Sequence, residues 1–416
     1  MFDLDGRIRL TDEPVVASVL LAGDLCPINR LGPMLASGDL VGAFGDCREL
    51  FGRADLTVVN LEAPLCRREA PLDKLGPNFR GDPAIAAPLA DLPVHVACLA
   101  NNHTMDQGVD GLLETLDALD EAGIQAVGAA RVRSEARGPL VLDVAGLRVA
   151  LVNTATVEGA VPPDGPGPAR IDHLADRRAV ADAAADCDLV IPIVHTGKEQ
   201  VPFPSPGLQQ FFRELADAGA AAVVGHHPHV PQGIELHAGR PIAYSLGNFL
   251  FDWHEPEPET ASSFLLELGL GPSGVAELAV HPFAQTEGGG VDLLRGERRA
   301  EYVALLADLS EPLTRPDEVG PLWREQCRAL FDTWYRNRLP RGADIGSDDP
   351  EKRMRAWLTF LNILDLNEHG WVLYEGLLQL ATGTAREDPG ARRTIDNLLD
   401  RLKGFAPPWH EADPPG

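Results

Sequence analysis

The sequence lacks the features that mark several protein classes. Its six cysteines are scattered over 416 residues, and no two of them form a CxxC pair. A zinc ribbon or a thioredoxin-type redox motif is therefore unsupported, and thiols spaced in this way are typical of a reducing compartment. No apolar run approaches the roughly 20 residues that span a bilayer, and the acidic first residues lack the apolar core of a signal peptide. These observations predict a cytoplasmic protein without a membrane span.

Basic residues are scarce beside acidic ones. The chain has 36 Lys and Arg against 62 Asp and Glu, which gives a formal net charge of -26. This balance argues against nucleic acid and against anionic membrane surfaces as partners. A small or oligomeric anionic substrate would need local positive charge, which bound divalent cations can provide.

Three common catalytic motifs are also missing. The sequence contains no GxSxG nucleophile elbow, no Walker A loop and no HExxH helix. Its hydrophobic content of 44% is that of an ordinary globular protein, so global disorder is not expected. At 416 residues the chain is long enough for two domains.

Short apolar runs alternate with helical patterns along the first half of the chain. Leucines at helical spacing predict a helix over Gly108–Ala122, and two apolar runs around Ala145-Gly146 predict a hairpin over Pro139–Asn153. Further helices are expected at Leu174–Asp186 and Pro206–Ala218. Strands are expected at Val15–Ala22, Leu56–Val59, Val94–Ala100, Asp188–Val194, Ala221–Val224, Gly233–Leu236, Pro241–Tyr244, Ser263–Leu270 and Ala276–His281. Alternation followed by a strand-rich segment favours an α/β sandwich with a mixed sheet.

The pattern changes twice along the chain, which predicts three segments. Residues 1–14 form an N-terminal arm, residues 15–308 carry the α/β pattern, and residues 309–416 form a helical C-terminal domain or cap. The Gly-rich and charged segment Gln285–Arg299 is expected to be a loop. In the last segment, helices are expected at Pro321–Arg338, Pro350–Leu364, Gly370–Leu380 and Ala391–Leu402.

Polar side chains follow at least five of the predicted strands, at the point where each strand ends. They are Asp24, Glu62, Asn102-His103, His195 and the pair His227 and His229. Because ligands gather at the carboxyl ends of strands in α/β sheets, these groups are expected to converge. Carboxylate, amide and imidazole groups in one cleft suit divalent metals.

Each residue taken alone also allows an ordinary structural role. Asp24 can be a turn or N-cap residue, Glu62 a surface acid and His195 a core histidine. Asp106 can be the N-cap of the helix that follows it. The most specific signal is His227-Pro228-His229, because an extended backbone would aim both imidazoles to the same side.

Six segments together resemble one protein family in order and spacing. Over roughly residues 15–285 the chain resembles the CapA family of bacterial capsule and poly-γ-glutamate synthesis proteins, which looks like a branch of the metallophosphoesterase superfamily. The resemblance implies a four-layer αββα sandwich of the metallophosphoesterase type, and it does not cover the helical C-terminal extension. The six segments are Gly23-Asp24, DLTVVNLEAPL (55–65), LANNHTMDQG (99–108), HTGKE (195–199), GHHPHVPQGIE (225–235) and PIAYSLGNFLFD (241–252).

The resemblance also implies a site with two divalent ions of Mn, Zn or Fe. By position, Asp24 binds the first ion together with His229, and Glu62 bridges the two ions. The second ion is held by Asn102, His195 and His227. The catalytic residues are expected to be Asp24 and His103, and His103 protonates the leaving group or stabilises developing charge. Substrate contacts are expected from Asn60, Asn101, Glu199, His226 and Asn248.

Two positions depart from the family pattern. Thr196 stands where the family usually has Trp after the strand-end His, which is expected to change the pocket wall. Metallophosphoesterases have a DxH first motif, whereas Cys26 stands at the His position of Asp24-x-Cys26. The resemblance therefore implies a first ion that is short of one ligand, with the site holding one ion or two. Cys26 either places its thiolate near this ion or is buried in the structure.

The function that follows is a metal-dependent hydrolase that activates water. Two bonds remain open as targets, a phosphoester and a γ-glutamyl-type amide, because both reactions build negative charge on oxygen in the transition state. Two alternatives from other classes also remain open. One is a non-catalytic accessory protein of a polymer-synthesis system, and the other is a metal-dependent binding protein.

Overall fold

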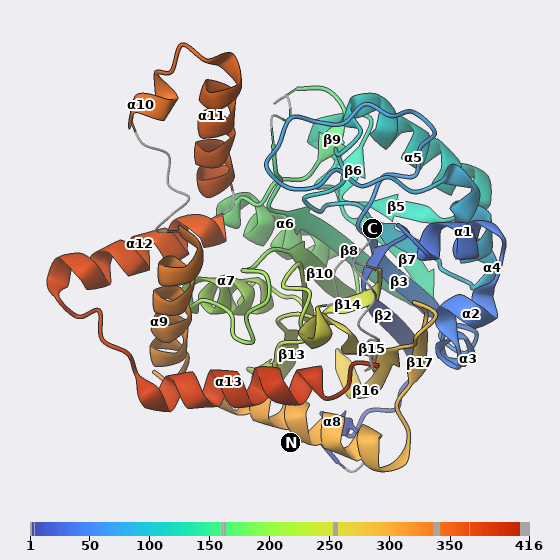
Figure 1. Ribbon diagram of the computed structural model, residues 1–416. Helices are drawn as coiled ribbons and strands as arrows, with labels where there is room; N and C mark the ends of the chain where they lie inside the picture. Colours follow the sequence, from blue (N-terminus) through green and yellow to red (C-terminus); the bar gives the residue numbers. More distant parts are fainter. Residues whose placement is uncertain are drawn as a thin grey trace.

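Figure 1 shows the computed structural model, in which two β-sheets face each other and helices cover both outer faces. The larger sheet has β2 (Ala17–Cys26) at its centre, and β3 (Leu56–Leu61) is parallel to it. The described residues are 2–3, 5–159, 161, 164–252, 257–315, 317–335, 342–365 and 367–407.

The larger sheet is mixed. Its order is β1 (Arg7–Arg9), β16 (Val275–Gln285), β15 (Ser262–Leu270), β2, β3, β4 (Val96–Cys98) and β5 (Gln125–Val127). Two strands lie off this path: β14 (Asn248–Phe251) runs parallel to β2, and β17 (Val291–Leu293) pairs with β16. The segment β2 to β5 is parallel, whereas β15 and β16 are antiparallel to their neighbours.

The second sheet is smaller, and its central strands are parallel. The expected hairpin forms as β7 and β8 and lies at one edge. The order is β12 (Ile234–His237), β13 (Arg240–Ala243), β11 (Val223–His226), β10 (Leu189–His195), β8 (Leu147–Ala155) and β7 (Leu140–Val144). A separate two-stranded sheet joins β6 (Ala129–Ala130) and β9 (Gly167–Pro168).

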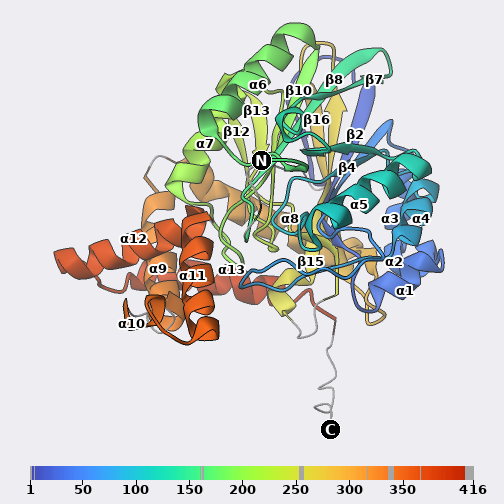
Figure 2. The same cartoon turned by 90° about the horizontal axis from the view of Figure 1, so that it is seen from above.

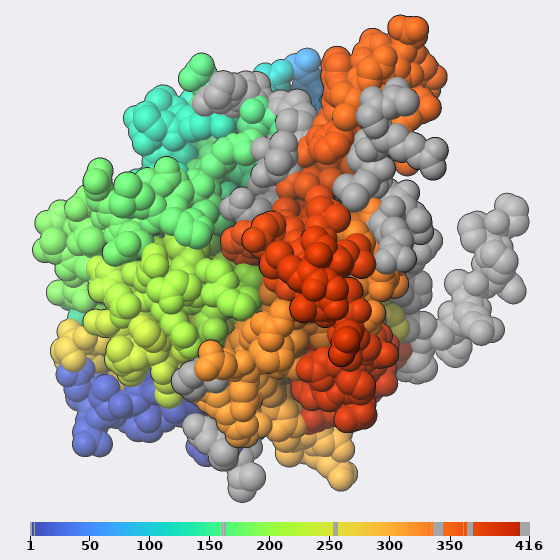
Figure 3. Space-filling model, turned by 90° about the vertical axis from the view of Figure 1, so that its left-hand side faces the viewer, coloured from blue at the N-terminus to red at the C-terminus, as the bar shows by residue number. Residues whose placement is uncertain are grey.

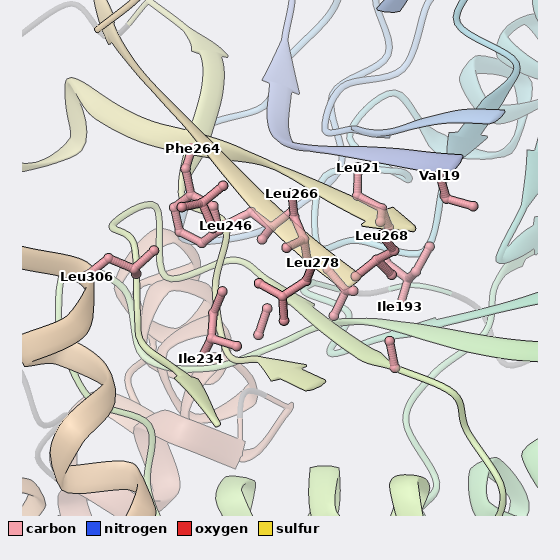
Figure 4. Close-up of a cluster of buried hydrophobic side chains, with 14 of the residues drawn as sticks. Val19, Leu21, Ile193, Ile234, Leu246, Phe264, Leu266, Leu268, Leu278 and Leu306 are labelled. Carbon is pink, nitrogen blue, oxygen red and sulfur yellow. The ribbon is translucent and has the colours of Figure 1, made fainter. Parts of the chain in front are cut away.

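The main hydrophobic core lies between the two sheets (Figure 4). Val19 and Leu21 of β2 point into it and meet residues of the second sheet such as Ile193. The alternate residue Leu20 belongs to the cluster on the outer face of the larger sheet. Both faces of β2 are therefore buried, which explains why its sequence is a continuous apolar run rather than an alternating one.

Helices complete the four layers, as the view in Figure 2 shows. The outer face of the larger sheet is covered by α1 (Leu31–Ala36), α2 (Leu40–Phe44), α3 (Cys47–Phe51), α4 (Ala86–Asp91) and α5 (Gly108–Ala122). The outer face of the second sheet is covered by α6 (His173–Asp186) and α7 (Pro206–Asp217). The expected four-layer αββα sandwich is confirmed.

The C-terminal part is helical, as expected. It contains α8 (Gly296–Ser310), α9 (Val319–Leu330), α10 (Gly342–Ile345), α11 (Pro350–Asp365), α12 (Asn367–Thr382) and α13 (Pro389–Lys403). Both α8 and α13 pack against the core between the sheets, through Leu306 and Leu398 among others. Figure 3 shows the face on which the orange and red helices lie beside the green layer of α6 and α7. Among the described residues, no helix is both long and apolar enough to cross a membrane.

The expectation of a loop over Gln285–Arg299 holds for residues 286–290 and is wrong for most of the rest of the segment. That segment contains β17 and the first turn of α8. The amphipathic helix α8 is hard to recognise from composition because its first turn is rich in charged residues that lie on the surface. Its buried positions, such as Tyr302 and Leu305, come later in the helix. The same helix runs through position 308, where the sequence pattern changes. At the other end of the predicted α/β segment, the N-terminal arm contributes β1 to the larger sheet.

Other predicted boundaries shift by a few residues. The strand expected at Val15–Ala22 is observed at Ala17–Cys26, because pairing with β3 and β14 carries it through Asp24. The helix expected at Pro321–Arg338 is α9, which is followed by one π-helical turn over Phe331–Tyr335. Residues 336–338 of that expectation lie outside the described residues.

Candidate metal centre

The polar residues that end the central strands meet between the two sheets. Asp24 lies near the end of β2, Glu62 directly follows β3, and His195 ends β10; all three are fully buried. The larger sheet thus supplies the carboxylates, and the second sheet supplies imidazoles from β10 and from the residues after β11. The expected convergence of strand ends is found in the structure.

The Gly-Asp pair on β2 has a steric cause. The backbone N–H of Asp24 donates to the carbonyl of Gly247 at 3.0 Å. A Cβ atom at Gly23 would lie 2.0 Å from that same carbonyl oxygen, so only glycine allows the two segments to approach. This contact brings Asn248 beside Asp24.

One group of ligand atoms surrounds Nε2 of His195. Oδ1 of Asn102 lies 2.9 Å from it, Nδ1 of His227 lies 3.1 Å from it, and Oε1 of Glu62 lies 3.4 Å from it. Metal–ligand bonds of about 2.0–2.2 Å place neighbouring ligand atoms roughly 3 Å apart. The spacing of these four atoms therefore suits a single ion.

A second group shares Glu62 with the first. It consists of Asp24, Glu62 and His229, whose ligand atoms lie within 4.8 Å of one another. Nδ1 of His229 is 3.3 Å from Oδ2 of Asp24, and its Nε2 is 3.8 Å from Oε1 of Glu62. A third possible combination joins Glu199 to His227 and His229. Glu62 thus belongs to two groups, one with Asp24 and His229 and the other with His195 and His227.

The carboxylate of Glu62 fits a bound cation. It is 0% exposed, and neither of its oxygens has a hydrogen-bond partner among the described residues. Burying an ionised carboxylate without a partner costs roughly several kcal/mol. Proteins avoid this cost by pairing the carboxylate with another group or with a metal ion. Burial and the charge of Asp24 raise the pKa of Glu62 well above its usual value.

The pKa values of the three histidines are set by burial and by the same carboxylates. Burial and His227 lower the pKa of His195, and burial lowers the pKa of His227 to about 4. Both are neutral at pH 7, the form that binds metal. Burial also lowers the pKa of His229, but the charges of Glu62 and Asp24 outweigh it and raise that pKa to about 10. The carboxylates of Asp24 and Glu62 thus favour a positive charge next to them.

The prediction of an extended backbone at His227 and His229 is wrong. Their φ angles are 98° and 60°, in the left-handed region that non-glycine residues rarely adopt. The two rings still converge, with centroids 5.7 Å apart. Strained backbone of this kind costs about 1–3 kcal/mol per residue and gathers at functional sites.

Three of the expected substrate contacts lie behind the ligand atoms. Asn60 donates from Nδ2 to Asp24 at 2.8 Å, and Nδ1 of His226 lies 3.2 Å from the same carboxylate. Asn101 donates to the backbone carbonyl of Leu61 at 2.8 Å. All three residues are buried and hold Asp24 or β3 in place. Their positions favour a supporting role over the expected contact with substrate.

His103 is held by a buried ionic network that includes a residue the sequence did not single out. Its Nδ1 lies 2.7 Å from Oδ2 of Asp106 and 3.1 Å from Nζ of Lys74. Lys74 also contacts the carboxylate of Asp106, and its side chain is 1% exposed. Burial and the charge of Lys74 lower the pKa of His103. These contacts occupy Nδ1 and leave Nε2 for the pocket.

Asp106 is not the N-cap of the helix that follows. That position belongs to Gln107, one residue later. The carboxylate of Asp106 instead accepts from the backbone N–H of Phe79 at 2.6 Å, besides contacting His103 and Lys74. Phe79 packs on the His103 ring, with centroids 4.2 Å apart. Asp106 and Phe79 therefore fix the orientation of His103.

A cavity of about 250 Å³ opens onto this centre. Among the expected site residues, Asn102, His103, Glu199, His229 and Asn248 line it. Asn248 also contacts Nδ1 of His229 through its Oδ1 at 2.9 Å. Lining residues that the sequence did not indicate include Phe79, Glu158, Gln200, Phe251, Asn362 and His369.

Cys26 lies next to the centre in an apolar cluster. It packs with Ala63, Phe79 and Phe251 and is 0% exposed. Burial and the charge of Glu62 raise the pKa of the Cys26 thiol well above its usual value. Cys26 belongs to none of the candidate ligand groups found among the described residues. The structure therefore favours the buried role of this thiol.

Comparisons with known proteins agree with the resemblance seen in the sequence. Residues 18–253 match the family model described as "Bacterial capsule synthesis protein PGA_cap". The chain is 34% identical to "PGA biosynthesis protein CapA" of Bacillus subtilis over 198 residues, which are 47% of this chain and 52% of that protein. It is also 34% identical to "Capsule biosynthesis protein CapA" of Bacillus anthracis over 236 residues, 55% of each chain. The chain thus spans about half the length of these relatives.

Two further likenesses are more distant. A "Probable polyglutamine synthesis accessory protein" of Mycobacterium tuberculosis is 30% identical over 263 residues, which cover 56% of this chain and 69% of that protein. Among solved structures, a 5'-nucleotidase from Candida albicans aligns over 75% of this chain and 58% of that one, with 11% identity and a TM-score of 0.40. At this score the structural likeness adds nothing to the fold described above.

Proposed function

Because the chain belongs to the bacterial capsule synthesis protein PGA_cap family, we propose that it is a metal-dependent hydrolase with a site for two divalent ions. Asp24, Glu62 and His229 hold the first ion. Glu62 also holds the second ion, together with Asn102, His195 and His227. The mixture of imidazole nitrogens with carboxylate and amide oxygens suits Mn, Zn or Fe.

The observation that carries this proposal is the position of Glu62. Its buried carboxylate has no hydrogen-bond partner among the described residues, and it lies within 3.8 Å of imidazole nitrogens of both His195 and His229. A carboxylate with this surrounding is destabilised unless a cation lies beside it or it takes up a proton. Two ions that shared Glu62 would supply this charge and would account for both ligand groups.

The reaction follows from the residues around the centre. When bound, a pair of divalent ions supplies an activated water and positive charge where negative charge develops. His103 holds a proton at Nδ1 toward Asp106, so its Nε2 accepts a proton from the attacking water and then passes that proton to the leaving group. The bond that is cleaved is a phosphoester or a γ-glutamyl-type amide. The amide option is supported by relatives whose names refer to PGA biosynthesis and polyglutamine synthesis.

The test uses the metal-loaded protein with p-nitrophenyl phosphate, bis-(p-nitrophenyl) phosphate and γ-glutamyl-p-nitroanilide. We expect turnover of at least one of them, and a loss of about 10²–10⁴-fold in kcat for His103→Gln with unchanged metal content. The matched control is His237→Ala, because this partly exposed histidine contacts Asp217 and belongs to none of the ligand groups. Absence of turnover with all three substrates, or equal activity of His103→Gln, would contradict the proposal.

The second candidate is a metal-binding accessory protein without catalysis. It is favoured by the name of the mycobacterial relative, "Probable polyglutamine synthesis accessory protein". The same experiment separates the two candidates, because an accessory protein binds metal but turns over none of the three substrates.

A further inference from the structure

Part of the pocket wall comes from helices outside the family match. The match ends at residue 253, whereas Asn362 lies on α11 and His369 on α12. Both residues line the same cavity as His103 and His229. The C-terminal helices, which lie beside the α6 and α7 layer in Figure 1, thus reach the candidate metal centre.

Asn362 is joined to the residues that hold His103. Its Nδ2 donates to Oε1 of Glu158 at 2.8 Å. The other oxygen of Glu158 lies 3.5 Å from Nζ of Lys74, and Lys74 lies 3.1 Å from Nδ1 of His103. Lys74 and Glu158 are both buried, so this chain of contacts is shielded from water and fixes α11 against the pocket.

His369 is held by Tyr335, which lies on the π-helical turn after α9. The side chain is 7% exposed, and its Nδ1 contacts the hydroxyl of Tyr335. Burial and the charge of Lys198 lower the pKa of His369 to about 3, so the imidazole is neutral at pH 7. The contact with Tyr335 determines which way the ring faces in the cavity.

The loop that carries Glu199 is packed under the same helices. Val201 clusters with Trp323 of α9 and Val372 of α12. Nε2 of Gln326, also on α9, donates to the carbonyl of Phe203 at 3.3 Å. The helices therefore pack on the loop between β10 and α7 and are not a loosely attached segment.

The cavity is small once these helices are in place. Its volume of about 250 Å³ is below the roughly 300–1,000 Å³ of pockets that enclose drug-sized ligands. Asn362 and His369 form part of the wall along which a ligand bound to the ions can extend. Such a cavity accepts a small molecule or the terminal group of a longer one.

We propose that Asn362 and His369 bind the part of the substrate that extends away from the metal centre, so that α11 and α12 restrict the site to small substrates or chain ends. This inference rests on the proposed function, because it assumes that substrate reaches the centre through this cavity. It assigns Tyr335 as a positioning residue that acts through His369.

The test uses two phosphonates as probes of the metal-loaded protein. Methylphosphonate and phenylphosphonate carry the same metal-binding group, whose tetrahedral oxygens resemble the phosphate group of a phosphoester and the transition state of amide hydrolysis. Only phenylphosphonate has a second end large enough to meet the outer wall. Calorimetric titration measures the affinity of each probe independently of turnover, and the metal content of each variant is measured in parallel.

We expect His369→Ala and Asn362→Ala to weaken phenylphosphonate binding by about threefold to tenfold, the loss expected when a few contacts with the phenyl ring are removed. Methylphosphonate affinity and metal content stay unchanged. Tyr335→Phe keeps the ring packing and is expected to give a smaller loss, so it preserves the test if His369→Ala does not fold. The matched control is Tyr374→Ala on α12, whose side chain is exposed and 66% accessible.

The outcomes separate the two proposals. If the parent protein binds neither phosphonate, the proposed function fails and this inference fails with it. If the parent binds both probes and neither His369→Ala nor Asn362→Ala alters either affinity, only this inference is overturned. Equal loss of both probes, or loss of metal, would place Asn362 and His369 in support of the metal centre and would also overturn it.

Discussion

His195→Ala removes the imidazole at the middle of the proposed second ion site. Nε2 of His195 lies within 3.4 Å of the ligand atoms of Asn102, His227 and Glu62. We expect the variant to lose the second ion and to keep the first, because Asp24 and His229 are unchanged. The stabilisation that the protein gains from metal should then fall by about half.

The expected size follows from linkage between binding and folding. An ion present at 100 times its dissociation constant stabilises the folded state by about 2.7 kcal/mol. The unfolding entropy near the midpoint is about 2.1 cal/mol/K per residue, or about 0.9 kcal/mol/K for 416 residues. Each ion therefore raises Tm by about 3 °C, so we expect a rise of about 6 °C in the parent and about 3 °C in His195→Ala.

The assay is thermal unfolding of each protein with and without Mn²⁺ or Zn²⁺. Each variant is compared with its own metal-free form, so the cavity left by the alanine does not affect the difference. His237→Ala is the control and should gain as much stability from metal as the parent, since His237 contacts only Asp217 among the ion pairs described. An equal rise of Tm in the parent and in His195→Ala would refute the assignment of His195 as a ligand.

Three further predictions follow from the same contacts. Asp106→Asn removes the negative charge next to Nδ1 of His103. We expect kcat to fall by at least about 10²-fold at unchanged metal content. An unchanged kcat would show that this contact does not contribute to catalysis. Cys26→Ala should leave the metal content unchanged because the thiol lies in an apolar cluster, and elemental analysis that finds fewer ions would contradict this. Asp172 caps α6 by accepting from the N–H groups of Leu174 and Ala175, and these contacts lower its pKa. Asp172→Ala should cost about 0.5–2 kcal/mol at pH 7. Because the pKa of Asp172 is lowered in the folded state, the difference should shrink as pH falls below about 4, and a difference as large at about pH 2 as at pH 7 would refute this.

The order and type of most elements could be predicted because the α/β part has strongly apolar strands. β2 and β10 are buried on both faces and stand out as continuous apolar runs. The prediction failed at α8, where charged residues of the first turn face solvent and conceal the buried positions Tyr302 and Leu305. A helix with a wide polar face and glycines before it resembles a loop when only its composition is considered.

The candidate site was partly visible in the sequence for a related reason. Asp24, Glu62 and His195 each lie at or just after the end of an apolar strand, so their meeting follows from parallel strands within each sheet and from the packing of the two sheets against each other. Lys74 and His369 carry no such signal. Lys74 lies in an irregular segment, and His369 reaches the cavity only through the packing of α9 and α12 on the loop around Val201. The left-handed backbone of His227 and His229 is likewise a tertiary feature that no local pattern encodes.

The measurement that tests the central claim most directly is the number of divalent ions bound per chain. Elemental analysis of the protein after exposure to Mn²⁺, Zn²⁺ or Fe²⁺ and removal of excess metal should find about two ions per chain in the parent. Glu62→Gln should lower that number, because Glu62 belongs to both ligand groups. A parent protein that retains no ion, or a Glu62→Gln variant that retains as many as the parent, would contradict the assignment of these strand-end residues to a shared metal centre.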